Sequence, residues 1–158
     1  MFRPMNRKKQ QLTEEECLQV LREAKRGVLA VTGDGGYPYA APLNHFYCEE
    51  DGRLYFHTGP TGHRPDALQR DNRVCFSVID GGTPAADGWS LDFKSVIVFG
   101  HAEPVTDHAR ALAITKELCY KFTKDEGYIE NEIRTSGANV FVFSVIIEHM
   151  SGKLVHEH

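Results

Sequence analysis

The segment Tyr55–Val78, YFHTGPTGHRPDALQRDNRVCFSV, carries the signals that decide how this chain folds. Its aromatic and β-branched start favours a strand, which the glycines and proline at positions 59, 60 and 62 bring to an end. A short helix is expected to begin at His63 or Arg64, and residues 73–78 return to an extended pattern. The segment therefore predicts a strand, a glycine-rich turn, a helix and a second strand.

Polar side chains gather where the first of these strands gives way to the helix. They are His57, Thr58, Thr61, His63 and Arg64. The first N–H groups of a helix are unpaired and carry a partial positive charge, so this end of a helix favours an anion. A guanidinium can in addition grip a phosphate with two hydrogen bonds. The pattern predicts a phosphate-binding turn, but it does not say to which molecule the phosphate belongs.

The composition narrows the class of protein. A chain of 158 residues fits a single domain, residues 1–158, and its 41% hydrophobic and 25% charged residues are ordinary for a globular protein. The formal charge of −4 disfavours a general nucleic-acid binder. No apolar run approaches the roughly 18 residues that a membrane helix needs. The basic start of the chain lacks the apolar stretch of a secretory signal, so we expect a cytoplasmic protein without membrane partners.

The cysteines and histidines do not form a metal-binding pattern. The four cysteines show no CxxC spacing, and the eight histidines include no HExxH motif. We therefore predict no metal centre. The cysteines are expected to be buried structural thiols, with a reactive thiol as the less favoured alternative.

Helices are expected in two main places, with a short arm before the first. Residues 1–11 read as an N-terminal arm. A helix should then begin after Thr13, because Thr13 and Glu16 form a capping box, and it should end near Gly27. A second long helix should follow Thr106 or Asp107, while residues 124–136 look irregular or briefly helical.

The remaining apolar segments predict about six strands. The expected strands are residues 28–32, 37–48, 53–58, 73–80, 95–105 with a bend at Gly100, and 139–147, and residues 149–158 read as a C-terminal tail. Strands and helices do not alternate, and several strands are apolar on both faces, which favours a small closed β-barrel with helices outside. Pro38 and Pro42 interrupt the second strand. They predict a plain edge strand or, less favoured, a strand whose freed backbone groups face a ligand.

The familiar nucleotide and hydrolase motifs are missing from the sequence. There is no GxxxxGK[ST], no GxGxxG after a strand and no GxSxG. Four blocks in order nevertheless resemble the pyridoxamine 5′-phosphate oxidase-like split barrels, and among these the Nim-type (nitroimidazole-resistance) flavoproteins. The blocks are GYPYAAPLNHFY, GRLYFHTGPTGHRPDALQRDNRVCFSV, FKSVIVFGHAEPV and VFVFSVIIEHMSGK, and the likeness runs from about Leu12 to Lys153.

This resemblance implies a mainly β fold, a six-stranded FMN-binding split β-barrel with outer helices, and a homodimer with FMN at the subunit interface. Carried over by position, the phosphate of FMN would contact Thr58, His63, Arg64 and the backbone near Gly62. The flavin ring would lie along Pro42, Leu43 and Asn44, and His57 would be the candidate catalytic residue as well as a cofactor contact.

Two positions depart from the pattern of the family that the chain resembles. Arg64 stands where many relatives carry lysine, and it can still hold a phosphate with a different geometry. His45 stands where an aromatic residue is expected. A histidine there could donate a proton near the flavin, or it could be a core histidine that is hydrogen-bonded to a neighbour, and the second interpretation is favoured.

The resemblance implies an FMN-dependent oxidoreductase that reduces small acceptors such as nitroimidazole-type compounds, with NAD(P)H as one donor to consider. Two alternatives stay open. One is a non-catalytic flavin-binding or redox-sensing protein, and the other is a split barrel that binds haem or a deazaflavin.

Overall fold

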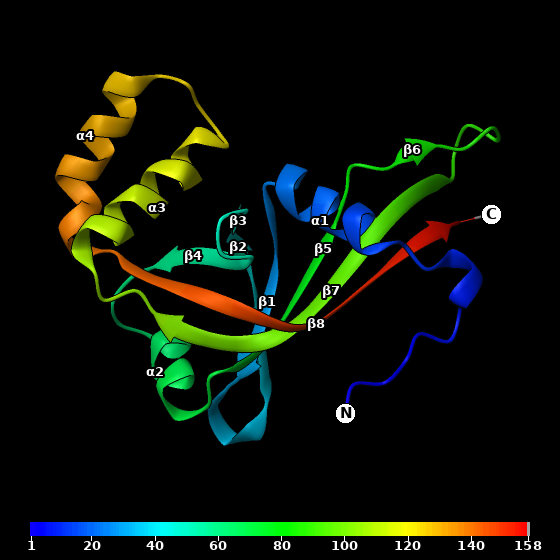
Figure 1. The fold of residues 1–158 in the computed structure, drawn as a ribbon, viewed down its shortest axis with the longest axis horizontal. Helices are drawn as coiled ribbons and strands as arrows, with labels where there is room; N and C mark the ends of the chain where they lie inside the picture. The colour runs from blue at the N-terminus through cyan, green and yellow to red at the C-terminus, as the bar shows by residue number, and fades with distance from the viewer. Residues whose placement is uncertain (158) are drawn as a thin grey trace.

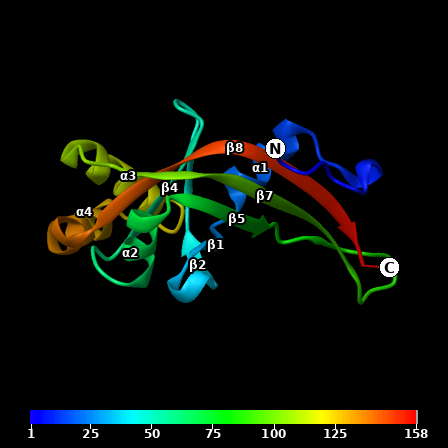
Figure 2. The same cartoon turned by 90° about the horizontal axis from the view of Figure 1, so that it is seen from below.

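A single antiparallel sheet of eight strands curls into a half-barrel, with helices around its outside (Figures 1 and 2). The structure is a computed structural model that describes residues 1–157. The strands are β1 Arg26–Thr32, β2 Pro38–Asn44, β3 Phe46–Cys48, β4 Arg53–Thr58, β5 Arg73–Ile79, β6 Thr83–Pro84, β7 Leu91–Pro104 and β8 Phe141–His156. The helices are α1 Glu14–Glu23, α2 His63–Arg70, α3 His108–Tyr120 and α4 Glu126–Ser136, with 3₁₀ turns η1 Lys8–Gln10, η2 Asp34–Gly36 and η3 Gly137–Asn139.

The order of the strands explains why the sheet curls. It runs β2-β1-β5-β7-β8-β4-β3, with the short β6 paired to β7. The two strands at the ends of this order, β2 and β3, are separated in sequence by His45 alone. Because one residue joins them, the two edges of the sheet must come together. The predicted mainly β split barrel with outer helices is thus confirmed.

The predicted number of six strands is wrong. His45 leaves the ladder and divides the expected strand 37–48 into β2 and β3, and the polar loop that follows residue 80 contains the two-residue strand β6. Such short pieces carry no periodic signal of their own, so the sequence pattern merges or omits them.

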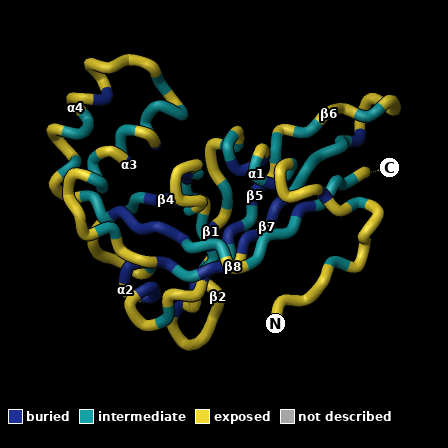
Figure 3. The backbone as a smooth tube through the Cα atoms, viewed as in Figure 1, coloured by how far each residue is buried: buried dark blue, intermediate teal, exposed yellow. Residues whose placement is uncertain are grey.

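The core of the half-barrel is built around three phenylalanines. The rings of Phe56 and Phe143 stack with centroids 5.3 Å apart, and Phe76 meets Phe56 edge-on at 5.1 Å. All three are fully buried, together with Leu29 and Val98. Figure 3 shows the buried stretches along β5, β7 and β8. These closely packed strands form the rigid part of the half-barrel, and the more exposed segments pack against it.

The longest ladder in the sheet joins β7 to β8. It pairs Asp92 with His156 at one end and Pro104 with Phe143 at the other, and its register shifts between Phe99 and Gly100. The bend expected at Gly100 matches this irregularity. The C-terminal tail predicted for residues 149–158 is wrong for residues 149–156, which belong to β8, and His158 lies outside the described residues.

Gly152 explains part of that error, because this residue of β8 has no side chain at the point where α1 crosses the strand. A Cβ atom at this position would lie 2.4 Å from Sγ of Cys17 and 2.9 Å from the side chain of Leu12. A glycine that marks a close helix–strand approach resembles a loop glycine when only the sequence is read. Gln11 pairs with Lys153 in an isolated bridge, so the N-terminal arm also runs against β8.

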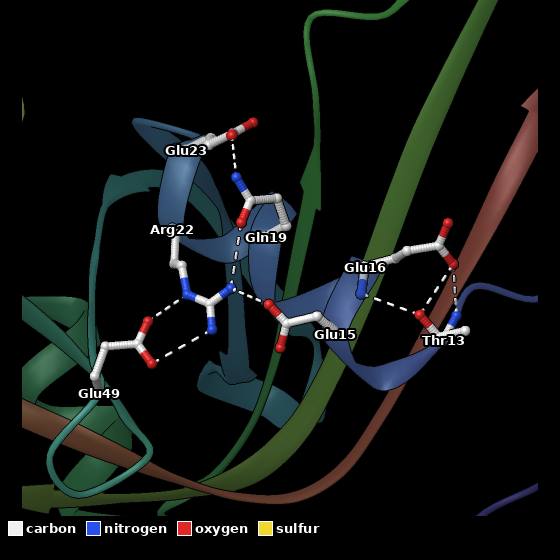
Figure 4. Close-up of polar contacts among 7 residues, drawn as sticks. All are labelled: Thr13, Glu15, Glu16, Gln19, Arg22, Glu23 and Glu49. Carbon is white, nitrogen blue, oxygen red and sulfur yellow. Dashed lines mark hydrogen bonds and ion pairs between the residues drawn. The ribbon is translucent and has the colours of Figure 1, made fainter.

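Helix α1 is fixed at its start by the predicted capping box and near its end by an ion pair (Figure 4). Thr13 Oγ1 accepts a hydrogen bond from the Glu16 N–H at 3.2 Å, and the Glu16 carboxylate accepts one from the Thr13 N–H at 2.8 Å. Arg22 pairs with Glu49 in the turn between β3 and β4. The helix ends at Glu23 rather than near Gly27, and the glycine instead lies in β1, where a Cβ would meet the Phe76 ring at 2.5 Å.

Helices α3 and α4 connect β7 to β8 at the end of the molecule farthest from the C-terminus (Figure 1). Asp107 caps α3 as predicted, by accepting a hydrogen bond from the Arg110 N–H at 2.8 Å. Of the two alternatives for residues 124–136, irregular or briefly helical, the helical one holds. The segment forms α4, which Asp125 caps by accepting a hydrogen bond from the Tyr128 N–H at 3.0 Å. Within residues 1–157, none of the helices is both long and apolar enough to cross a membrane.

Candidate functional site

A cleft separates the half-barrel from the pair of helices α3 and α4. It consists of two adjoining hollows of about 260 and 470 Å³ that share His57, Ser136 and Val140. The smaller hollow, which we call the inner cavity, lies against α3 and α4. Its walls are Asn44, His57, Thr115, Leu118, Cys119, Phe122, Thr123, Tyr128, Glu132, Ser136, Gly137 and Val140. The larger hollow, the outer groove, is lined by Leu43, His57, Thr58, Gly59, Thr135, Ser136, Asn139 and Val140.

The barrel side of this cleft is made by the ends of two strands that are not neighbours in the sheet. Leu43 and Asn44 end β2, and His57 and Thr58 end β4. These four predicted contacts meet because the sheet curls. β2 and β4 are not paired with each other in the sheet, but its curl brings their ends together. Burial lowers the pKa of His57, so its ring favours the neutral form.

Arg64 lies beside this row, at the start of α2. Its guanidinium donates a hydrogen bond to Thr58 Oγ1 at 3.2 Å. Its Nε is buried and has no hydrogen-bond partner in residues 1–157. By contrast, Arg22, Arg53, Arg70, Arg73 and Arg110 each pair with a carboxylate. A half-buried guanidinium that no carboxylate engages is suited to an anionic oxygen, although Arg64 itself lines neither hollow.

Gly62 shapes the turn in front of Arg64. Its φ of 122° lies in a region that side-chain-bearing residues rarely adopt, and no side chain caps α2. His63 follows, but it turns away from Arg64. The His63 ring lies 4.2 Å from the Tyr39 ring, and its Nε2 accepts a hydrogen bond from the Asp34 N–H at 3.2 Å. The structure therefore groups Thr58, Gly62 and Arg64, and places His63 against the β1–β2 turn.

Pro42 lies in an edge strand, as the favoured interpretation of its sequence predicted. It pairs with Val28 of β1, and its other side has no neighbouring strand among the described residues. Its side chain is exposed, and it lines neither the inner cavity nor the outer groove. Of the three residues expected along a flavin ring, only Leu43 and Asn44 line the cleft.

His45 is a core histidine, again in agreement with the favoured interpretation. It is fully buried at the junction of β2 and β3, and its Nε2 is 2.7 Å from the Leu21 carbonyl oxygen. Lys121 donates hydrogen bonds to the carbonyl oxygens of His45 at 2.7 Å and Ala24 at 2.6 Å. We call these four residues, Leu21, Ala24, His45 and Lys121, the seam. Burial lowers the pKa of His45 to about 4 and that of Lys121 to about 8.

Comparison with known proteins identifies the fold family. The family model described as pyridoxamine 5′-phosphate oxidase matches residues 13–154. The chain belongs to this family. No curated protein sequence matches it.

Solved structures that resemble this family member share the fold across most of the chain. A candidate 5-nitroimidazole antibiotic resistance protein of Bacteroides thetaiotaomicron is 24% identical, with a TM-score of 0.75 over 92% of this chain and 87% of its own. An FAD-binding protein of Mesorhizobium loti is 25% identical, with a TM-score of 0.64 over 92% and 96%. An FAD- and haem-binding protein of Mycobacterium smegmatis is 19% identical, with a TM-score of 0.66 over 94% and 74%.

Several residues that line the cleft were not predicted from the sequence. They come from α3, α4 and the turn after α4, and include Thr115, Cys119, Tyr128, Glu132 and Ser136. One local signal could have indicated the start of α4. Asp125 is a typical N-cap residue, and its carboxylate accepts a hydrogen bond from the N–H of Tyr128. No cluster of three or more His, Cys, Asp or Glu side chains suited to a metal occurs within residues 1–157.

Proposed function

We propose that this protein binds FMN in the cleft and reduces small electron acceptors, including nitroimidazole-type compounds. The observation that carries the proposal is the Arg64 guanidinium, which Thr58 orients and whose buried Nε has no partner within the described residues. A phosphate monoester supplies the dianionic oxygens that such a group lacks. The FAD-binding relative and the nitroimidazole-resistance relative are consistent with this choice of ligand class and reaction.

The residues at the cleft fit the two ends of FMN. Arg64 and the backbone at Gly62, next to the outer groove, would hold the phosphate together with Thr58. Leu43 of the outer groove would lie along the ring, and Asn44 would meet the edge of the ring from the inner cavity. Bound FMN supplies the hydride and electron chemistry that the side chains lack. The neutral ring of His57 can accept or donate a hydrogen bond at the point where the inner cavity and the outer groove join.

A comparison of FMN with riboflavin tests the phosphate contact. The two ligands share the ring and differ in the phosphate. Arg64→Ala should lower the affinity for FMN by about 10- to 150-fold, because the lost contact is a charge-assisted hydrogen bond of about 1.5–3 kcal/mol. The affinity for riboflavin should change little. Arg70→Ala on the same helix is the matched control, because Arg70 pairs with Asp34 instead. Equal loss of both ligands, or no loss of FMN, would remove Arg64 from the site.

The absorbance spectrum separates the possible cofactors and activities. The purified protein should show flavin bands, and flavin that is released on denaturation should be FMN rather than FAD. A haem Soret band in their place would overturn the proposal. Anaerobic addition of NADPH or NADH and then of a nitroimidazole should bleach and restore the flavin bands. Flavin that transfers nothing to any acceptor after chemical reduction would make the protein a carrier or sensor.

The same proposal includes a homodimer. Val28, Ile79, Ile97 and Phe99 are exposed on the outer face of β1, β5 and β7. The register places Val28 and Ile97 in one row across the sheet, on either side of Ser77. An apolar sheet face of this kind is typical of a protein–protein contact, and a second copy covers it with the same residues.

Light scattering coupled to size exclusion tests the dimer. The unmodified protein should elute with twice the mass of its 17.8 kDa chain, and Ile97→Glu should shift it to the monomer, because two carboxylates would be buried at the contact. Ile79→Thr, a milder change on the same face, should leave the dimer largely intact. A monomer in the unmodified protein would refute this part of the proposal.

A further inference from the structure

The inner cavity holds polar groups that the protein itself does not use. Thr115 Oγ1 already donates to the Ala111 carbonyl at 2.9 Å, and Thr123 Oγ1 accepts from the Asp125 N–H at 3.1 Å. The side chains of Asn44, His57, Tyr128, Glu132 and Ser136 also line the cavity, and none of them forms a side-chain hydrogen bond or ion pair within residues 1–157. Tyr128 and Ser136 are exposed to solvent, whereas Asn44, His57 and Glu132 are half-buried. Half-buried polar groups without an internal partner around a concave, half-apolar space are a mark of ligand recognition.

The charge of the cavity limits the ligand that it can take. Glu132 is the single carboxylate among the described residues of its wall, and that wall contains no lysine or arginine. Burial favours the neutral form of His57, so the imidazole does not offset the carboxylate. An anionic ligand would therefore meet repulsion from Glu132. Lys25 and Arg26 lie over the Phe122 ring, 5.4 and 5.6 Å from its centroid, but neither lines the cavity, so a cation or a strong hydrogen-bond donor is favoured within it.

The size and the apolar walls of the cavity limit the ligand further. Leu118, Phe122 and Val140 provide its apolar surface, and Tyr128 adds an aromatic ring. A volume of about 260 Å³ is below the roughly 300–1,000 Å³ of pockets that bury drug-sized molecules. It suits a molecule with one planar ring.

We infer that the inner cavity binds the second substrate of the protein, a one-ring planar molecule that presents a hydrogen-bond donor or a positive charge to Glu132 and carries no anionic group. This assignment of substrate class rests on the proposed function, in which the flavin occupies the outer groove. The outer groove and the inner cavity share His57. It also means that a pyridine nucleotide, with its phosphates, does not use the inner cavity.

Three isosteric probes test the inference on the protein as purified with its flavin. Benzamidine is a cation, benzamide is neutral and benzoate is an anion, and they share one planar ring. Titration by calorimetry, with amide NMR shifts to locate the site on α3 and α4, should rank their affinities in that order. Benzamidine should bind about 10-fold or more tightly than benzoate, given a charge contact that is only partly screened by solvent.

Glu132→Gln should abolish the preference for benzamidine over benzoate while leaving the flavin bound. Glu130→Gln is the matched control, because Glu130 is exposed on the same helix and lines neither hollow. Benzoate binding as tightly as benzamidine, an unchanged preference in Glu132→Gln, or no binding of any probe would each overturn the inference. Arg64→Ala should weaken FMN and spare benzamidine, so the failure of flavin binding and the failure of the inner cavity give different results.

Discussion

The seam and the cleft both contain a histidine and a basic side chain, and they differ in how far these side chains bond to the backbone of other elements. In the seam, Nε2 of His45 lies against the Leu21 carbonyl while its buried Nδ1 has no hydrogen-bond partner in residues 1–157, and Lys121 joins two backbone carbonyls. In the cleft, His57 has no side-chain hydrogen bond within residues 1–157, and Arg64 keeps a buried Nε without a partner.

We expect this difference to separate residues that hold the fold together from residues that bind a ligand. The carbonyls of Leu21 and Ala24 belong to the end of α1, where the last carbonyls of a helix lack partners within it. His45 and Lys121 supply those partners from other elements and so hold α1, the β2–β3 junction and the end of α3 together. In the cleft, His57 forms no side-chain hydrogen bond within residues 1–157 and Arg64 forms one, to Thr58, so both keep polar atoms that a ligand could use. Substitutions in the two regions should therefore affect different properties.

The largest effect is expected at Lys121. Lys121→Met removes the donor for two carbonyls at once, and leaving buried polar groups unpaired should lower the free energy of unfolding by about 2–5 kcal/mol. Urea denaturation followed by circular dichroism measures this change. Lys124→Met is the control, because Lys124 is exposed and near the same helix end, and it should change stability by less than about 0.5 kcal/mol. Equal effects of the two substitutions would show that the seam does not hold the helices.

The next effect comes from acid and depends on His45. Its pKa is about 4 in the folded protein and about 6.5 in the unfolded chain, so the unfolded chain binds the additional proton as the pH falls below 6.5. Stability is full above pH 6.5 and should fall by about 3 kcal/mol between pH 7 and 4 through this residue. Denaturation midpoints across that range measure the slope. His45→Gln keeps an N–H for the Leu21 carbonyl and does not titrate, so it should flatten the slope, and an unchanged slope would exclude His45 as its source.

The seam also shows which parts of the structure the sequence could predict. The turn and helix after His57 follow from signals that lie next to one another, namely the glycines, the helix start and the return to an extended pattern. Thr58 and Arg64 were found together for that reason. The contact of Lys121 with Ala24 and His45 joins distant segments, so no local pattern reports it. Glu132 and Tyr128 were missed because the mixed polarity of residues 124–136 left open whether the segment is irregular or briefly helical, and gave no sign that it forms a wall of the cleft.

The smallest effect on stability is expected at His57, which sharpens the contrast with His45. His57→Gln replaces a side chain that has no internal hydrogen-bond partner in residues 1–157, so the free energy of unfolding should change by less than about 1 kcal/mol. The same substitution should alter the rate at which a reduced flavin is reoxidised by an acceptor, because His57 lines both the inner cavity and the outer groove. Stopped-flow absorbance measures that rate, and urea denaturation measures stability. If His57→Gln instead destabilises the fold as much as Lys121→Met, then the free groups of the cleft are structural, and the difference between the two regions does not mark a binding site.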